Sequence, residues 1–349
     1  MASSDFSIRL IAPGDGPALE ALLKASPVRG EIGFTYDYQA DILAVSQALA
    51  VDLVGAVAVQ DGAVIGMVYG ELLPVQWAGG VCQGVYVSNL RVRPDFQRQG
   101  LARRLGDWGL AYLTERLGRD VVLYAAIPEG NISLNLAQRH GFISTRQIQG
   151  GVIPMRRTPP RLIPGLQIRP ASREDLPAFA EGVNEFYREH DLWNPVTPAS
   201  LEIFLERQVR GIRPNQLYIV TRGGEVVGGL SLSDRTQLVR MRVTGASAFV
   251  RLLGDLLGVL PRDGVLRALT VREVWFGDGQ LEAGRYLWQQ LRYRLRERGD
   301  CLGIAYDPHD RLADLFQVPF WLPLVKARYL VRAGSLPEQG RPIYCIAGA

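Results

Sequence analysis

The pattern of apolar positions in the middle of the N-terminal half predicts a strand that leads into a helix. Val85 and Val87 lie on one face of this strand, whereas Leu90 and Val92 lie on the other face by strict alternation. The apolar phase therefore slips by one residue just before Leu90, as happens where a strand contains a β-bulge. Because a bulge bends and splays a strand, the pattern also predicts a slot beside it.

The turn after this strand has the features of an anion-binding helix start. Pro94 ends the strand because it has no N–H for a sheet hydrogen bond. The turn is basic and rich in glutamine, and Gly100 stands where the helix begins. A helix start offers unpaired N–H groups and the positive end of the helix dipole, and glycine lets a ligand approach the backbone closely. We therefore predict an anion cradle here, most simply for a pyrophosphate.

Helix and strand patterns alternate around this segment, which is typical of the mixed α/β class. An Asp-Gly turn between two alternating apolar runs predicts a hairpin, and a short continuous apolar run predicts a buried strand. The expected elements are a strand over 7–11, a helix capped by Asp15, a loop followed by a helix over 27–50, a hairpin of 54–59 and 64–72, a buried strand over 121–127, and helices after Gly100 and over 132–140.

A proline-rich stretch over residues 156–165 interrupts the pattern, which then begins again. At 349 residues the chain is also long for one core. We therefore expect a first domain over residues 1–156, a linker over 157–166 and a duplicated second domain over 167–349. The repeated features are Ile8-Arg9 with Asp15 and Ile168-Arg169 with Asp175, residues 62–66 and 224–228, and residues 90–92 and 269–271.

Composition narrows the classes of function. Apolar residues make up 47% of the chain and charged residues 21%, which is typical of a globular protein. The net charge of +4 is small and the basic residues are spread over the chain, so we expect no nucleic-acid partner. The three cysteines and three histidines lack metal-ligand spacing, so no metal is predicted. Without a signal peptide or a membrane-spanning apolar run, the sequence predicts a cytoplasmic protein with no membrane partner.

Residues 97–102, Gln-Arg-Gln-Gly-Leu-Ala, resemble motif A of the GCN5-related N-acetyltransferases (GNAT). The Leu-x-Val-x-Pro strand end, the bulged strand, and an asparagine followed by a helix that closes on Gly-Phe are also similar to this family, over residues 5–155. The layout resembles the tandem, mycothiol synthase-like members. The resemblance implies an α/β (α+β) fold of two tandem GNAT-type domains. Each is expected to be a mixed, mostly antiparallel twisted sheet flanked by helices, with splayed fourth and fifth strands.

The resemblance also implies acetyl-CoA as the acyl donor. In the family, main-chain N–H groups of the cradle hold the pyrophosphate, and the strand before it pairs with the pantetheine arm. Asn131 is expected at the pantetheine or sulfur end. The implied cofactor-binding residues are Leu90, Arg91, Val92, Gln97, Arg98, Gln99, Gly100, Leu101, Ala102, Arg103 and Asn131.

The family's reaction is direct acyl transfer to an amine, which must lose a proton because a free alkylamine has a pKa of roughly 10. A main-chain N–H near Leu90 could stabilise the anionic oxygen that forms. Two departures from the family pattern stand out. Ala137 occupies the place where many members have a tyrosine acid, and Ser88-Asn89 the place where many have a carboxylate.

Three other residues are candidates for the acid and base, namely Tyr124, Tyr86 and Glu71. Tyr124 comes first because its strand lines the acetyl end of the slot in the family. Each residue also has a structural interpretation, as a strand aromatic or a solvated strand end. The expected function is thus acetyl transfer to a small-molecule amine. The alternative is a non-catalytic sensor or scaffold that binds CoA or acetyl-CoA on the same fold, and nothing in the sequence fixes an oligomeric state.

The second copy lacks the cradle sequence. Phe276 stands at the place of Gln97 and Asp278 at the place of Gln99. An acidic residue repels phosphate, so we expect a degenerate GNAT-like domain that helps to wall the acceptor site.

Overall fold

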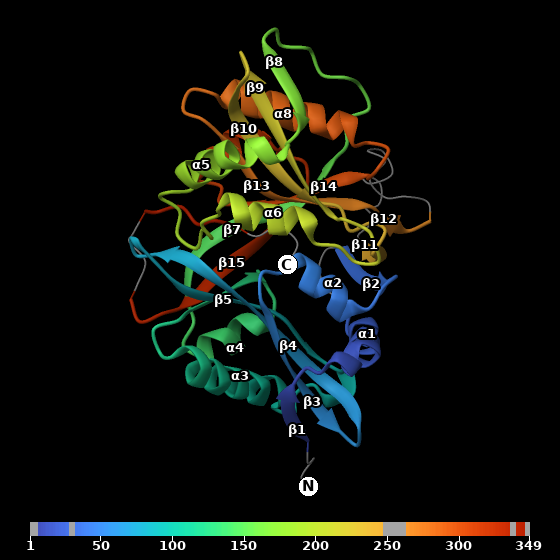
Figure 1. The fold of residues 1–349 in the computed structure, drawn as a ribbon. Coiled ribbons are helices and arrows are strands. Elements are labelled where there is room, and N and C mark those ends of the chain that lie inside the picture. Colours follow the sequence, from blue (N-terminus) through green and yellow to red (C-terminus); the bar gives the residue numbers. More distant parts are fainter. Residues whose placement is uncertain (1–5, 28–31, 247–262, 336–339, 346–349) are drawn as a thin grey trace.

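One long sheet runs through the whole protein (Figure 1). The computed structural model describes residues 6–27, 32–246, 263–335 and 340–345. Within these ranges the sheet has twelve strands, and only β5 with β6 and β13 with β14 pair in parallel. In order across the sheet the strands are β1 (Ser7–Leu10), β3 (Leu53–Gln60), β4 (Ala63–Trp77), β5 (Gly80–Val92), β6 (Val122–Pro128), β15 (Val325–Arg332), β7 (Ile143–Pro154), β14 (Cys301–Tyr306), β13 (Ala268–Phe276), β10 (Glu225–Ser233), β9 (Asn215–Arg222) and β8 (Leu166–Pro170).

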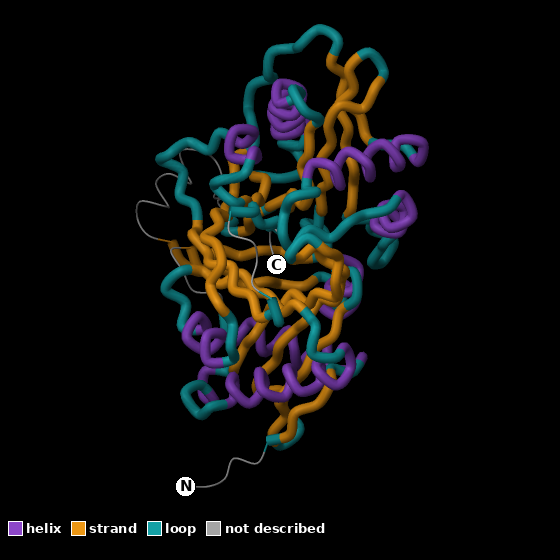
Figure 2. The backbone as a smooth tube through the Cα atoms, turned by 90° about the vertical axis from the view of Figure 1, so that its left-hand side faces the viewer, coloured by secondary structure: helices purple, strands orange, loops and turns teal. Residues whose placement is uncertain are grey.

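Helices cover both faces of this sheet (Figure 2). In the N-terminal part, Val57 packs in one core with α1 and α2, whereas Ala56 packs in another with α3. Successive strand residues point to opposite faces, so these helices lie on opposite sides of the sheet. The described α-helices are α1 (Gly16–Ala25), α2 (Ile42–Leu49), α3 (Leu101–Leu117), α4 (Ser133–Arg139), α5 (Leu176–Phe186), α6 (Pro198–Glu206), α8 (Leu281–Arg294) and α9 (Arg311–Phe316).

The mixed, mostly antiparallel fold predicted from the sequence is confirmed. The order β1-β3-β4-β5-β6 of the N-terminal part has a counterpart in β8-β9-β10-β13-β14 of the C-terminal part. The repeated Arg and Asp residues form the same ion pair in both parts. Arg9 lies 2.6 Å from Asp15, and Arg169 lies 2.5 Å from Asp175.

The two parts of the chain exchange strands where they meet. β15, near the C-terminal end, lies between β6 and β7 and pairs with both. β7 in turn pairs with β14 of the C-terminal part. The connection over residues 155–165 contains no helix or strand, but the sheet continues across it. The division into residues 1–156 and 167–349 stays a prediction, and hydrogen bonds join the two parts along their shared strands.

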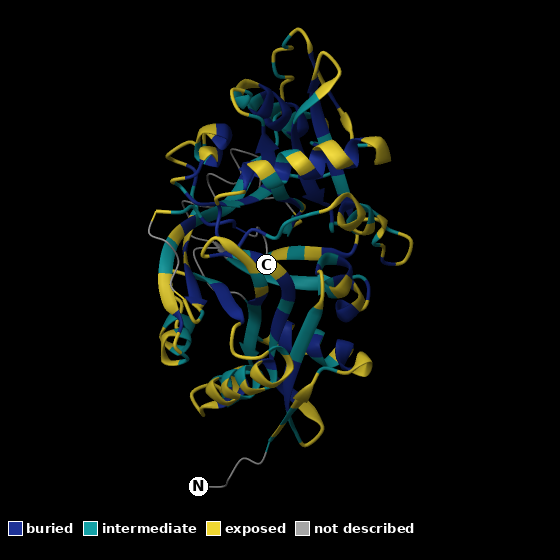
Figure 3. Cartoon of the chain, turned by 60° about the vertical axis from the view of Figure 1, so that its left-hand side comes forward, coloured by how far each residue is buried: buried dark blue, intermediate teal, exposed yellow. Residues whose placement is uncertain are grey.

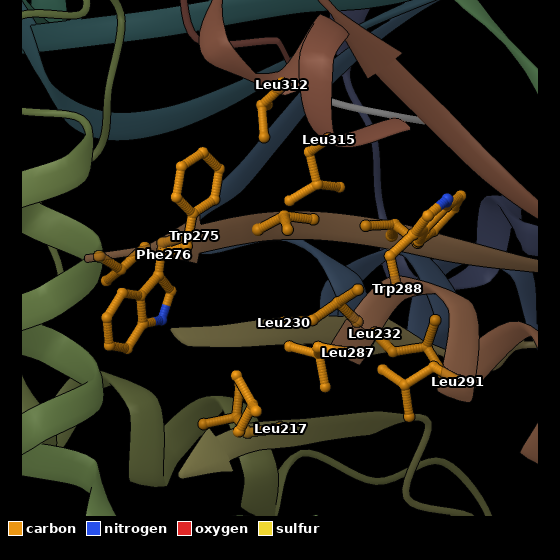
Figure 4. Close-up of a cluster of buried hydrophobic side chains, with 14 of the residues drawn as sticks. Leu217, Leu230, Leu232, Trp275, Phe276, Leu287, Trp288, Leu291, Leu312 and Leu315 are labelled. Carbon is orange, nitrogen blue, oxygen red and sulfur yellow. The ribbon is translucent and has the colours of Figure 1, made fainter. Parts of the chain in front are cut away.

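The largest core cluster lies in the C-terminal part, where α5 and α8 pack against β9, β10 and β13 (Figure 4). Buried and half-buried residues predominate along the strands in the middle of the protein, whereas the outer helices expose one side (Figure 3). No helix of the described ranges is long and apolar enough to cross a membrane. Those same ranges hold no group of His, Cys, Asp or Glu side chains arranged for a metal ion.

One predicted element is wrong. Residues 27–50 were expected to form a loop and then a helix, but Ile32–Tyr38 form the strand β2. β2 pairs with β11 (Val239–Ala246), which also pairs with β12 (Val265–Leu266), in a separate three-stranded sheet. Its partner lies some 200 positions away in the sequence, so local pattern could not reveal it. β2 and α2 thereby lie at the boundary with the C-terminal part (Figure 1).

Candidate functional site

The predicted bulge and slot are both present in β5. Arg91 is opposite Met67 and Ser88 is opposite Tyr69, so two residues of β5 face one residue of β4. Asn89, within the bulge, has φ 52°. β5 and β6 pair only as far as Tyr86 and then separate. The edge of β5 that faces β6 is therefore left open toward its C-terminal end, as the phase slip predicted.

The turn after β5 has the geometry of an anion cradle. Arg98 has φ 62° and Gly100 has φ 79°, and α3 begins directly afterwards. The N–H of Arg104 donates to the Gly100 carbonyl oxygen at 3.1 Å and is the first to enter the helical ladder. The N–H groups of residues 101–103 precede that ladder, so they are oriented for an acceptor beyond the helix end.

The two glutamines of the motif hold the loop in shape. Gln97 Nε2 donates to the Val92 carbonyl oxygen at 3.0 Å, and Gln99 Nε2 donates to the Asp95 carbonyl oxygen at 2.9 Å. Their side chains therefore act on the main chain of the cradle. The cations at its mouth are exposed, and Arg103 forms only a 3.7 Å ion pair with Asp107 at 73% side-chain exposure. Such a pair is weak in water, so Arg103 can turn to a phosphate.

A cavity of about 470 Å³ opens from the slot toward the C-terminal part of the chain. Of the predicted site residues, Glu71, Tyr86, Leu90, Arg91 and Asn131 line it. Val92 and residues 97–103 lie at the cradle end instead, and Tyr124 does not line the cavity. The C-terminal part contributes a wall, formed by Ser233, Arg235, Val239, Thr270 and Arg272.

Residues 20–142 match the acetyltransferase (GNAT) family. This segment is a GNAT domain. It includes the bulged strand, the cradle and the slot, so its fold and its family point to acyl-CoA-dependent acyl transfer. No curated protein matches the chain in sequence.

Solved structures share the fold over almost the whole chain at low identity. A GCN5-related N-acetyltransferase from Sphaerobacter thermophilus is 17% identical with a TM-score of 0.60, over 94% of this chain and 95% of that chain. An N-myristoyltransferase from Saccharomyces cerevisiae with bound myristoyl-CoA is 11% identical with a TM-score of 0.66, over 97% and 81%. A GCN5-related N-acetyltransferase from Anabaena variabilis is 13% identical with a TM-score of 0.54, over 94% and 73%. At these identities the likeness concerns the fold.

Glu71 of the GNAT domain is held at the end of α2. Its Oε1 accepts a hydrogen bond from the Val51 N–H at 2.8 Å. Its other oxygen has no hydrogen bond to any described residue, and the side chain lines the cavity. This carboxylate can therefore accept a proton from a group bound in the cavity.

Tyr86 and Tyr124 close the inner end of the slot of the GNAT domain. Their rings lie 5.3 Å apart between centroids, and Tyr329 of β15 stacks behind Tyr124 at 6.3 Å. Burial raises the pKa of both Tyr86 and Tyr124, so both hydroxyls stay neutral at physiological pH. The Tyr124 hydroxyl is buried without a hydrogen-bond partner among the described residues. Its position in the core fits a structural role better than contact with a substrate.

His140 and Arg91 line the same cavity with different surroundings. The His140 ring lies 2.9 Å from the Leu136 carbonyl oxygen and 3.1 Å from Asp107, so both ring nitrogens are occupied at the end of α4. Arg91 has a buried Nε without a partner among the described residues, and burial lowers its pKa. Ala137 also lines the cavity and brings no hydroxyl to it.

Sequence reasoning missed the arginines that the C-terminal part brings to the GNAT domain. Arg272 Nη1 donates to the Leu49 carbonyl oxygen at 3.0 Å, across the boundary between the two parts. No motif surrounds Arg272, and its sequence distance from α2 is large. The only available signal was the internal repeat. It aligns residues 269–271 with residues 90–92 of the strand beside the slot, and Arg272 directly follows the aligned residues.

The corresponding slot of the C-terminal part is filled by the chain itself. β13 and β14 pair only over Ala268–Thr270 and Cys301–Gly303, as β5 and β6 do near their own start. The space beyond is a void of only about 10 Å³, and Ile343, Tyr344 and Cys345 line it. At the place of the cradle, Asp278 is 96% exposed and pairs with Arg311 at 3.1 Å.

Proposed function

We propose that the protein transfers an acetyl group from acetyl-CoA to a small-molecule amine, in the cavity between its GNAT domain and its C-terminal part. The observation that carries the proposal is the continuity of three features, namely the cradle, the splayed slot and the cavity. One acetyl-CoA molecule can then place its pyrophosphate at the cradle and its thioester at the inner end of the slot. Leu90, Arg91 and Val92 would meet the pantetheine arm along the way, and Asn131 would meet it from the opposite side.

The slot has the length that such an arm needs. From Val92 back to Tyr86 the strand covers about 20 Å, at about 3.3 Å per residue. An extended pantetheine arm has a length of the same order. Its amide groups can pair with the open edge of β5, because the bulge leaves that edge without a neighbouring strand. The thioester would then lie beside Tyr86 and the first residues of the open edge.

The closed end of the slot supports a short acyl group. Tyr86, Tyr124 and Tyr329, the tyrosine floor, occupy the direct continuation of the slot between β5 and β6. The cavity of about 470 Å³ must also hold the pantetheine arm and the acceptor. Both observations favour acetyl over a long fatty acyl chain.

In the proposed reaction the amine nitrogen attacks the thioester carbonyl carbon. The C–N bond forms, the C–S bond breaks, and coenzyme A leaves as its thiolate. Glu71 takes the proton that the amine must lose, directly or through a water molecule. A main-chain N–H of the open β5 edge stabilises the carbonyl oxygen as it becomes anionic. The neutral Tyr86 hydroxyl is the candidate donor for the thiolate.

Calorimetric titration with acetyl-CoA tests the cradle. Gly100→Val is expected to weaken binding at least tenfold, because a β-branched residue does not fit φ 79°. Gly62→Val is the matched control, since Gly62 has φ 78° in the distant hairpin turn and, like Gly100, has free space around it. Equal loss of binding in both variants, or none in Gly100→Val, would show that the cradle is wrongly placed.

Release of free thiol in the presence of amines separates an enzyme from a CoA sensor. The sensor alternative draws its support from Ala137, which cannot act as the family's tyrosine acid. Acetyl-CoA binding with amine-dependent thiol release supports acetyl transfer. Binding with no release above the amine-free rate, over a panel that includes anionic, neutral and cationic amines, supports the sensor.

A further inference from the structure

The lining of the cavity has an excess of positive charge. Its charged lining side chains in the described ranges are Glu71, Arg91, Arg235 and Arg272. Glu71 is the only carboxylate among them. Buried or half-buried cations are costly unless an anion lies nearby, so Arg91 and Arg272 favour a ligand that brings negative charge.

Glu71 and Arg272 are held side by side at the end of α2. Glu71 Oε1 accepts from the Val51 N–H at 2.8 Å, and Arg272 Nη1 donates to the Leu49 carbonyl oxygen at 3.0 Å. These two main-chain groups are only two residues apart. Yet no ion pair within 4.0 Å joins the two side chains. The carboxylate and the guanidinium are thus neighbours that make no direct ion pair, although the charge of Glu71 helps to raise the pKa of Arg272.

Burial lowers the pKa of Arg272, but the charges of Glu273 and Glu71 raise it more, so its pKa lies above the ordinary value and its guanidinium stays charged. Its nearest carboxylate among the described residues is Glu273, with Nε and Oε1 4.0 Å apart. Glu273 already accepts hydrogen bonds from the Ser231 and Tyr344 hydroxyls. The Arg272 side chain is 19% exposed, so water compensates little of its charge. Arg207 adds a second cation, and its pKa is lowered by burial and, to a smaller extent, by the charge of Arg272.

We infer that the acceptor is an amine that also carries an anionic group, a carboxylate or a phosphate, a few bonds from its nitrogen. Arg272 binds the anion and Glu71 faces the amino group. Arg91 also lines the cavity and adds to the positive potential. This inference rests on the proposed acyl transfer and names its acceptor class. It also gives the C-terminal part a function, because β13 supplies the residue that selects the acceptor.

The test uses pairs of amines that differ only in the anion. The pairs are glycine with glycinamide, leucine with leucinamide, and phosphoethanolamine with ethanolamine. Binding to the CoA-loaded protein is measured by calorimetry, and turnover by thiol release with acetyl-CoA. The variants are Arg272→Gln, Arg272→Lys and the control Arg292→Gln. Arg292 is also half-buried and also donates to a main-chain carbonyl, that of Pro154 at 2.8 Å, but it does not line the cavity.

The wild-type protein should prefer the anionic member of at least one pair by about 10- to 100-fold, the range of a charged hydrogen bond. Arg272→Gln should abolish that preference, Arg272→Lys should keep part of it, and Arg292→Gln should leave it unchanged. Preference for amino acids or for phosphoethanolamine distinguishes carboxylate from phosphate. Preference for the neutral members, no binding of either member of any pair, or a preference that survives in Arg272→Gln would overturn the inference. Acetyl-CoA titration of the same samples reports on the proposed function separately, because it involves no acceptor.

Discussion

Truncation of Tyr86 should change which acyl chains the protein accepts. The Tyr86 side chain is buried and lines the cavity, and its ring lies against Tyr124 at the closed end of the slot. Tyr86→Ala removes that ring and opens the slot toward Tyr124. Each methylene that the longer acyl chain then buries contributes about 0.8 kcal/mol, or about fourfold in affinity. Hexanoyl-CoA has four more carbons than acetyl-CoA, so it should gain up to about 3 kcal/mol in the variant.

The assay is calorimetric titration with acetyl-, butyryl- and hexanoyl-CoA. The wild-type protein should show no gain in affinity with acyl length, whereas Tyr86→Ala should show a rise with each step. The substitution also removes core packing worth about 3–5 kcal/mol, so thermal unfolding must show that the variant remains folded. Tyr187→Ala is the control, because Tyr187 is equally buried in the core of the C-terminal part and outside the cavity. Tighter binding of hexanoyl-CoA by the wild-type protein, or the same ranking in wild type and Tyr86→Ala, would refute the tyrosine floor.

Three further predictions concern catalysis and stability. Glu71→Gln should lower the rate of acetyl transfer about 10²- to 10⁴-fold with little change in acetyl-CoA affinity, since it removes a base and not a cofactor contact; an unchanged rate in steady-state assays would remove Glu71 from the mechanism. Arg169 holds the pKa of the Asp175 carboxyl below its ordinary value, so this ion pair stabilises the fold above about pH 4 and the stabilisation is lost as the pH falls further. Asp175→Asn should therefore lower Tm by several degrees at pH 7 and flatten the acid limb of the Tm profile, and calorimetry that shows no change would contradict this. His190 and Asp310 form a buried contact at 3.0 Å, so His190→Ala should lower the free energy of unfolding, measured by chemical denaturation, by about 1–3 kcal/mol. A decrease of less than about 0.5 kcal/mol would contradict this.

Local features of the GNAT domain could be predicted from the sequence because each leaves a local trace. The slip in the apolar pattern before Leu90 indicated the bulge, since successive side chains of a regular strand alternate strictly between its two faces. Gly100 at the start of α3 indicated the cradle, since its φ of 79° is one that glycine adopts readily. The Arg9 and Asp15 pair recurred as Arg169 and Asp175, and it made the repeated strand order foreseeable.

Features that depend on distant partners could not be predicted in this way. β15 enters the sheet between β6 and β7, and its own pattern says nothing about which strands it joins. Arg272 reaches the cavity only because β13 and α2 meet across the boundary between the two parts. Tyr124 was the first candidate for catalysis because its strand borders the slot, but its side chain points into the core beside Tyr329. The place of a strand in the fold therefore predicts that it borders the slot, but only its register decides which of its side chains face the ligand.

Titration of the full chain with acetyl-CoA tests the central claim most directly. The cradle and open slot occur in the GNAT domain, whereas the chain's own residues 343–345 fill the corresponding slot of the C-terminal part. We therefore predict saturable binding of one acetyl-CoA per chain, abolished or strongly weakened by Gly100→Val. A stoichiometry of two would contradict the filled second slot, and the absence of binding at submillimolar acetyl-CoA would contradict the account as a whole.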